Sequence, residues 1–209
     1  NLKSLKVPIP PLKEQKLISQ YLDKKTSQID SLIEKIEKKI ELLNEQKTAL
    51  INQYVTKGLD PNVEMKDSGF EWIGEIPKHW KITKLKYLSV IKVQYGLNIE
   101  SDLYCETGVR LLRITDINND GSLKKIGGVY LKKSNVPNEY ILKKGDFLFS
   151  RTGATVGKST LINSSSDSMS FAGYLVRFNF ENFDLSIFVS FYSQSSAFWD
   201  WINLQITQS

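Results

Sequence analysis

The stretch SRTGATVGKST, residues 150–160, contains the residue types of a phosphate-binding loop. Its two glycines, Gly153 and Gly157, are followed by Lys158 and Ser159. A P-loop has four residues between its glycines, so that successive backbone N–H groups surround a phosphate. Only three residues separate the glycines here. Because a shorter loop aims its N–H groups differently, the stretch does not predict a nucleotide hydrolase.

A second stretch, DINNDG at residues 116–121, matches the opening of an EF-hand calcium loop. Such a loop also ends in a bidentate Glu at its twelfth position. That position is occupied by Gly127 in this chain. We therefore expect a hairpin turn at this stretch, without bound calcium.

The remaining reactive residue types do not form a catalytic pattern. The single histidine, His79, has neither the cysteine partners of a zinc site nor a Ser or Cys triad around it. The sequence also lacks the glycine-rich loop that a sulfonium cofactor needs and the converging carboxylates of a metal-dependent nuclease. We expect a chain without catalysis, without a metal site and without a cofactor.

Cysteine content and hydropathy suggest where the chain acts. The single cysteine, Cys105, cannot form an internal disulfide, which suits the reducing cytoplasm. No run of the sequence approaches the roughly 18 apolar residues of a membrane span. We expect a cytoplasmic protein that has no membrane partner.

The charge of the chain is unevenly distributed. The net charge is +5, but residues 78–158 carry 15 Lys and Arg against 7 Asp and Glu. Residues 159–209 carry 1 basic residue against 4 acidic ones. A concentration of positive charge favours a polyanionic partner such as nucleic acid. A lysine-rich solvated surface would have the same composition.

Residues 12–57 contain neither Gly nor Pro and are rich in Lys, Glu, Leu, Ile and Gln, which favour helix. Pro11 can occupy the first helical turn, where its missing N–H costs nothing. Gly58 and Pro61 supply the stop. The sequence therefore predicts one helix about 65 Å long, at 1.5 Å per residue.

Seven-residue spacing along this helix predicts a coiled-coil seam, which needs a partner helix. One series consists of Leu22, Ile29, Ile36, Leu43 and Leu50, and the interleaved series consists of Thr26, Ile33, Ile40, Lys47 and Tyr54. The predicted helix-pairing interface comprises both series without Thr26 and Lys47. Packing of the helix along its own domain is the alternative.

After Pro61, short apolar runs between turn residues predict strands. They lie at 109–115, 128–131, 146–151, 159–162 and 172–180. The final stretch, residues 184–206, has closely spaced aromatic residues without Gly or Pro, so we expect it to be helical and to face the core. The predicted fold class is α+β: a long coiled-coil helix followed by a mixed α/β domain with a twisted, mostly antiparallel sheet.

Polar and basic residues near the predicted strand ends carry the groups that bind DNA. Hydroxyls, backbone amides and lysine in the glycine-rich turn can hold phosphates, arginine can bind guanine bidentately, and the amides of VQYGLN can contact adenine. For the cluster that ends the strand at 109–115, a surface ion pair is the alternative. The candidate DNA-binding residues are Gln94, Tyr95, Asn98, Arg110, Arg113, Thr115, Asp116, Arg151, Thr152, Gly153, Thr155, Lys158 and Ser159.

Three parts of the chain resemble the DNA specificity subunit of type I restriction-modification systems. VPIPPLKEQKLISQYLDKKTSQIDSLI resembles the start of that family's conserved helical region, and LINQYVTKGL resembles its end. KDSGFEWIGEIPKHW resembles the approach to a target recognition domain. LLRITDINNDG and GDFLFSRTGATVGKS resemble the body of such a domain. The resemblance spans nearly the whole chain.

This resemblance implies sequence-specific binding of double-stranded DNA, with one domain reading half of a bipartite site. It implies that residues 1–11 end a preceding domain or form a linker, that 12–57 form a spacer helix, and that 58–209 form the target recognition domain. In the family, the helices and domain flanks bind modification subunits, which methylate DNA and connect to the restriction motor subunit. On that pattern the chain has no catalysis of its own.

The chain departs from the family plan, which has two helices and two recognition domains. We expect either a fragment or a half-length subunit that forms a twofold homodimer through residues 12–57. A coiled-coil adaptor between proteins, without DNA readout, is the alternative function.

Overall fold

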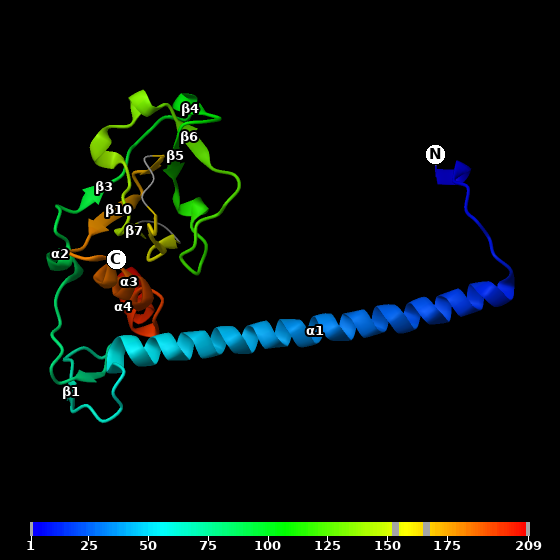
Figure 1. Ribbon diagram of the computed structural model, residues 1–209, viewed down its shortest axis with the longest axis horizontal. Coiled ribbons are helices and arrows are strands. Elements are labelled where there is room, and N and C mark those ends of the chain that lie inside the picture. Colours follow the sequence, from blue (N-terminus) through cyan, green and yellow to red (C-terminus); the bar gives the residue numbers. More distant parts are fainter. Residues whose placement is uncertain (1, 152–154, 165–167, 208–209) are drawn as a thin grey trace. The chain divides into compact units, whose positions relative to one another are not determined.

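The computed structural model describes residues 2–151, 155–164 and 168–207. The chain divides into two compact units, Asn1–Lys47 and Thr48–Ser209. The short helix η1 (Leu2–Ser4) and most of the long helix α1 (Leu12–Lys57) belong to the first unit. The second unit contains the last turns of α1 and all the strands (Figure 1).

Local signals set both ends of α1, and its predicted bounds are confirmed. The Gln15 N–H donates to the carbonyl oxygen of Pro11 at 3.0 Å, which begins the helical pattern. At the other end, Gly58 has a φ of 74° and its N–H donates to the Tyr54 carbonyl at 3.2 Å. A glycine in the left-handed region at this position is a common helix stop.

The predicted helix-pairing residues of α1 are exposed in the single chain. Their exposed fractions range from 41% for Tyr54 to 57% for Ile36. Isoleucine and leucine side chains that remain exposed in a row along one helix are typical of a face that pairs with another helix. The apolar seam is therefore available to a partner.

The strands of the second unit form one hairpin and two four-stranded sheets. The hairpin pairs β1 (Met65–Asp67) with β2 (Glu75–Pro77). The first sheet has the order β3 (Gln94–Tyr95), β10 (Leu175–Asn179), β7 (Asp146–Ser150) and β8 (Ser159–Leu161), and all its pairs are antiparallel. The second sheet has the order β4 (Tyr104–Cys105), β6 (Val129–Leu131), β5 (Val109–Leu112) and β9 (Met169–Phe171). Only its β5 and β9 are parallel in the described residues, so the mostly antiparallel character is confirmed, in two sheets rather than one.

The strand expected at 109–115 is shorter than predicted. It ends at Leu112 and is followed by the 3-10 turn η3 (Ile114–Asp116). The Asp116 carboxylate accepts the Arg113 N–H at 2.9 Å, which folds the chain back at this point. The other short helical segments are α2 (Leu85–Leu88), η2 (Ser101–Leu103), η4 (Lys133–Asn135) and η5 (Asn138–Tyr140).

Alternating side chains of β7 pack into two different parts of the core. Leu148 belongs to a buried cluster with Leu112 of β5 and Phe171 of β9, so this cluster joins the two sheets. Phe147 belongs to another cluster with Val189 of α3 (Phe183–Tyr192). Because both faces of β7 are covered, the central residues of the strand, 147–149, form a continuous apolar run in the sequence.

The C-terminal stretch is helical, as expected, and it forms two helices. α3 ends at Tyr192 and α4 (Ser196–Thr207) follows, and Figure 1 shows them together in orange and red. Ser193 Oγ donates to the Ser190 carbonyl at 2.9 Å, and Ser195 Oγ donates to the Tyr192 carbonyl at 2.7 Å. Serine side chains that bond to nearby backbone compete with helix continuation, which explains the break. No helix in the described residues has the length and apolar character to cross a membrane.

Candidate nucleic-acid interface

Three strands of the first sheet place polar and aromatic residues at one end of that sheet. β7 ends before Arg151, β3 ends at Tyr95, and β10 begins just after Tyr174, with β10 between the other two strands (Figure 1). The Arg151 N–H donates to the Tyr174 carbonyl at 3.2 Å. The guanidinium carbon of Arg151 lies 4.7 Å from the ring centre of Tyr95. We call Gln94, Tyr95, Asn98, Arg151 and Tyr174 the Arg151 surface.

The stacked arginine of this surface is open to a ligand. Arg151 is exposed, and Tyr95 and Tyr174 have exposed fractions of 56% and 62%. An aromatic ring beneath a guanidinium group holds the group in one orientation and leaves the N–H edges of the group free to donate. Such a fork matches phosphate oxygens or the N7 and O6 atoms of guanine.

Two glycines allow the backbone segments of this surface to lie close together. The Leu97 N–H donates to the Phe171 carbonyl at 2.9 Å, and the Gly173 N–H donates to the Leu97 carbonyl at 2.8 Å. A Cβ atom on Gly96 would collide with the Ala172 carbonyl, and one on Gly173 would collide with the Asn98 side chain. Asn98, which is exposed, is therefore held against the turn that precedes β10. Sequence reasoning missed Tyr174, because no local pattern distinguishes it from a core aromatic residue.

The predicted cluster around Arg113 is occupied by contacts within the protein. Arg113 Nε lies 3.2 Å from Asp116 Oδ2, and Arg113 Nη2 donates to the Gly127 carbonyl at 3.3 Å. The Asp116 side chain is 4% exposed. Arg110 donates through Nη2 to the Lys124 carbonyl. Of this cluster, Thr115 remains exposed. These contacts favour the ion-pair interpretation of Arg113 and Asp116.

The glycine-rich turn has several internal contacts. Thr152 and Gly153 lie outside the described residues. Thr155 Oγ1 lies 3.4 Å from Ser150 Oγ, and Lys158 Nζ donates to the Ile117 carbonyl at 3.5 Å.

Ser159, at the end of this turn, points into the protein. Ser159 is buried, and its Oγ donates to Ser193 Oγ at 2.9 Å. The structure therefore does not bring Ser159 together with the Arg151 surface. Its partner lies 34 residues further along the chain, so the sequence gives no local signal for this contact.

The stretch at 116–121 forms the expected hairpin turn. Ile117 pairs with Leu123 across it, and Ser122 donates to Asp120 Oδ1 through both N–H and Oγ, at 2.9 and 2.7 Å. Within the described ranges, no group of three or more His, Cys, Asp or Glu side chains is arranged to hold a metal ion.

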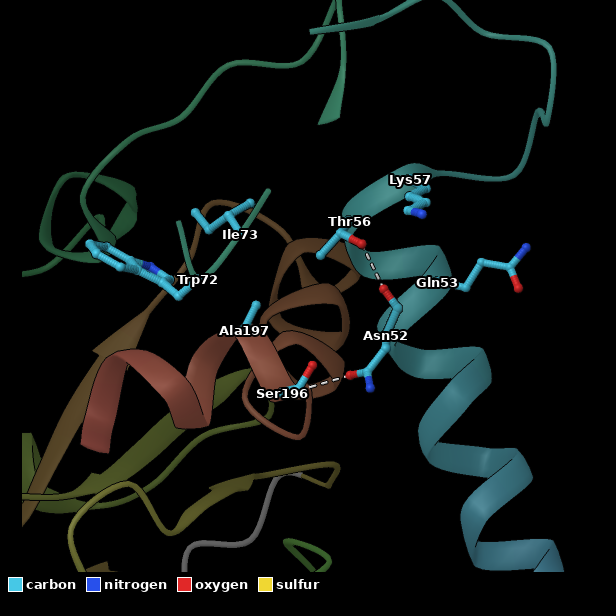
Figure 2. A pocket seen from close by; sticks show the side chains of 8 residues that line it. All are labelled: Asn52, Gln53, Thr56, Lys57, Trp72, Ile73, Ser196 and Ala197. Carbon is cyan, nitrogen blue, oxygen red and sulfur yellow. Dashed lines mark hydrogen bonds between the residues drawn. The ribbon is translucent and has the colours of Figure 1, made fainter. Parts of the chain in front are cut away.

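A pocket of about 430 Å³ in the second unit lies between the end of α1 and the start of α4. Asn52 Oδ1 accepts the Ser196 N–H at 2.8 Å, and Thr56 Oγ1 donates to the Asn52 carbonyl at 2.7 Å (Figure 2). Asn52 thus ties the last turns of α1 to the N-terminus of α4. The lining residues include no His, Cys, Asp or Glu, and Lys57 is the titratable side chain among them. Burial raises the pKa of Tyr192, which lies at the end of α3 and outside both the pocket lining and the Arg151 surface.

Comparison with known proteins finds a matching family model and curated relatives. The type I restriction modification DNA specificity domain matches residues 1–42. The specificity subunit of the type I restriction enzyme MjaVIII, from Methanocaldococcus jannaschii, is 33% identical over 162 residues, which are 74% of this chain and 34% of that protein. This chain is related to type I specificity subunits.

A second curated relative agrees with this relationship. The specificity subunit of the type I restriction enzyme EcoKI, from Escherichia coli, is 28% identical over 151 residues, which are 70% of this chain and 30% of that protein. The chain therefore spans about a third of the length of these curated relatives. A solved chain, described as showing complex assembly and conformational transition of the type I R-M system, matches 88% of this chain and 42% of its own length. Its TM-score is 0.42 and its sequence identity is 18%.

Proposed function

We propose that this chain binds double-stranded DNA and reads one half of a bipartite site as the specificity component of a type I restriction-modification complex. One observation carries the proposal: the exposed stack of Arg151 on Tyr95, at the end of a sheet in a chain related to specificity subunits. A pre-oriented guanidinium group with free N–H edges matches guanine or a phosphate. The excess of basic residues over 78–158 would attract the duplex to this unit.

The proposal assigns separate tasks to the parts of the chain. Residues 58–209 act as the target recognition domain, and residues 1–11 link to a preceding part. The exposed seam of α1 pairs with a second helix, and in a half-length subunit that helix comes from a second copy of the chain. Modification subunits supply methylation, and through them the restriction subunit joins the complex. The chain itself has no catalysis and acts in the cytoplasm.

Replacing Arg151 with alanine tests the DNA contact. The probe is a duplex that the parent chain selects from a randomised DNA library. Loss of one bidentate arginine contact costs about 1–3 kcal/mol, so we expect the dissociation constant to rise roughly 5- to 150-fold by the same scale. The control is Lys84→Ala, which removes one exposed positive charge that is not among the candidate contact residues. If Arg151→Ala binds the selected duplex as tightly as the parent, the proposed contact surface is wrong.

A coiled-coil adaptor is the second candidate function, and the exposed seam of α1 favours it. An adaptor needs no affinity for nucleic acid. Failure of the parent chain to enrich any duplex from the library would favour the adaptor over the DNA-binding function.

A further inference from the structure

A buried arginine lies directly behind the Arg151 surface. Arg177 stands on β10, opposite Gln94 of β3, and its side chain is 11% exposed. Its Nη1 donates to the Ile141 carbonyl at 3.3 Å and to Asp146 Oδ2 at 3.4 Å. Its Nη2 donates to the Glu139 carbonyl at 2.7 Å and to Gln94 Oε1. All four hydrogens on the terminal nitrogens thus have acceptors inside the protein.

This contact determines how the Gln94 carboxamide is oriented. Arginine has donors and no acceptor, so the Gln94 atom that meets Nη2 must be the oxygen. The two ends of a glutamine amide are normally hard to tell apart, but here the partner's chemistry decides between them. Across the described ranges of the chain, no residue accepts a hydrogen bond from the Gln94 amide nitrogen. Gln94 is partly exposed and directly precedes Tyr95, the ring on which Arg151 stacks.

We propose that Gln94 is a specificity-determining residue that acts on DNA as a hydrogen-bond donor, and that Arg177 is the positioning residue that makes it one. This inference rests on the proposed DNA-binding function. The partner is an acceptor atom on a base edge, N7 or O6 of guanine.

The donor role disfavours adenine. A free glutamine binds adenine bidentately, donating to N7 and accepting from the N6 amine. The second of these bonds needs the oxygen that Arg177 already engages. Guanine presents two acceptors in the major groove. Gln94 and Arg151 both offer N–H groups, so together they match guanine rather than the adenine contact expected from the sequence.

Substitutions of Gln94 distinguish the role of its amide oxygen from the role of its amide nitrogen. Gln94→Glu keeps an oxygen for Arg177 and makes the pair ionic, but replaces the amide donors with an acceptor. Gln94→Met removes both groups at similar size. The control, Val90→Glu, adds the same charge at an exposed position four residues earlier. The full-length variants select from a randomised duplex library, the bound DNA is sequenced, and thermal unfolding verifies that each variant is folded.

We expect the parent consensus to contain a guanine that Gln94→Glu replaces with cytosine, whose N4 amine is a donor. Gln94→Met should randomise that position and weaken binding about tenfold. Val90→Glu should keep the parent consensus. Arg177→Met, if folded, should admit adenine at the same position, which a purely structural role for Arg177 would not produce. If Gln94→Met weakens binding of all duplexes equally and the consensus stays the same, Gln94 contacts a phosphate and its proposed role in specificity is wrong.

Other outcomes contradict the inference. Unchanged consensus and unchanged affinity in both Gln94 variants would overturn it. An adenine in the parent consensus, at the position that Gln94→Met randomises, would overturn it as well. If the parent chain enriches no duplex at all, the proposed DNA-binding function itself fails. The Gln94 variants are compared with the parent consensus, so they test only the inference about Gln94.

Discussion

Arg151 and Arg113 both follow strands, yet their guanidinium groups have different surroundings. Arg113 is paired with the Asp116 carboxylate and the Gly127 carbonyl, whereas Arg151 is exposed and stacks on Tyr95. A guanidinium group whose hydrogen bonds are satisfied internally contributes mainly to stability, because breaking those bonds costs free energy. At the scale of single residues, we therefore expect stability and DNA binding to depend on different arginines.

The Asp116 carboxylate should be important for folding. It is buried and accepts from both the backbone and the side chain of Arg113. We expect Asp116→Ala to lower the free energy of unfolding by about 2 kcal/mol, because hydrogen bonds to charged groups are lost. The matched control, Asp120→Ala, removes an exposed turn acceptor and should cost about 1 kcal/mol or less. Urea unfolding measures both, and equal losses would contradict a special role for Asp116.

Gly157 should tolerate a side chain less well than Gly69. Both have positive φ, 90° and 77°, which costs an L-residue roughly 1–2 kcal/mol. A Cβ on Gly157 would also lie 3.1 Å from the Trp199 ring, whereas nothing lies within 4 Å of one on Gly69. We expect Gly157→Ala to cost about 1 kcal/mol more than Gly69→Ala, as overpacking does. Thermal and urea unfolding can verify the difference, and a larger loss for Gly69→Ala would refute this reasoning.

At the scale of elements, α1 combines a strong local preference for helix with an apolar face that its own chain leaves exposed. Ile33, Ile36 and Ile40 are about half exposed. Burying an isoleucine side chain is worth about 1.5–3 kcal/mol. The free energies of burial add up over the side chains of the seam, so the seam would strongly favour association of α1 with a second helix.

Two lysine substitutions in the seam should dissociate the proposed homodimer. We expect the parent to be a dimer at micromolar concentration and the Ile33→Lys, Ile40→Lys variant to be a monomer. Each substitution affects both copies, so the dissociation constant should rise by at least about 100-fold. Leu32→Lys, at an exposed position outside both heptad series, should remain dimeric. Light scattering gives the mass, and a monomeric parent chain would count against the pairing.

At the scale of the whole molecule, charge is concentrated in one part of the sequence. Residues 78–158 carry 15 basic against 7 acidic residues. A duplex is drawn to such a region by release of its counterions, and this contribution weakens as salt increases. The adaptor function involves no such dependence.

Salt titration should show this contribution directly. We expect the affinity for a selected duplex to fall roughly 100-fold between about 50 and about 200 mM salt, as a few phosphate contacts would cause. Arg151→Ala should reduce the slope of log affinity against log salt by about 1 if it contacts a phosphate, and should leave the slope unchanged if it reads a base. A salt-independent affinity for the parent would argue against phosphate contacts altogether.

Sequence alone determined the parts of this protein whose stability is local. The bounds of α1 follow from helix preference, Pro11 and Gly58, all of which act within a turn of the chain. The longer apolar runs at β7 and β10 were also predicted, because both faces of these strands are buried. The family relationship was visible for the same reason, since its motifs are continuous in the sequence.

Tertiary structure alone decided which polar groups remain available to a ligand. The two- and three-residue strands β3, β4 and β9 exist because distant strands pair with them, and such short segments carry no periodicity of their own. Arg151 meets Tyr95 across 56 positions of sequence, and Arg177 meets Gln94 across 83. Hydrogen bonding and stacking act between neighbours in space, so the free or occupied state of each donor follows from the packed fold.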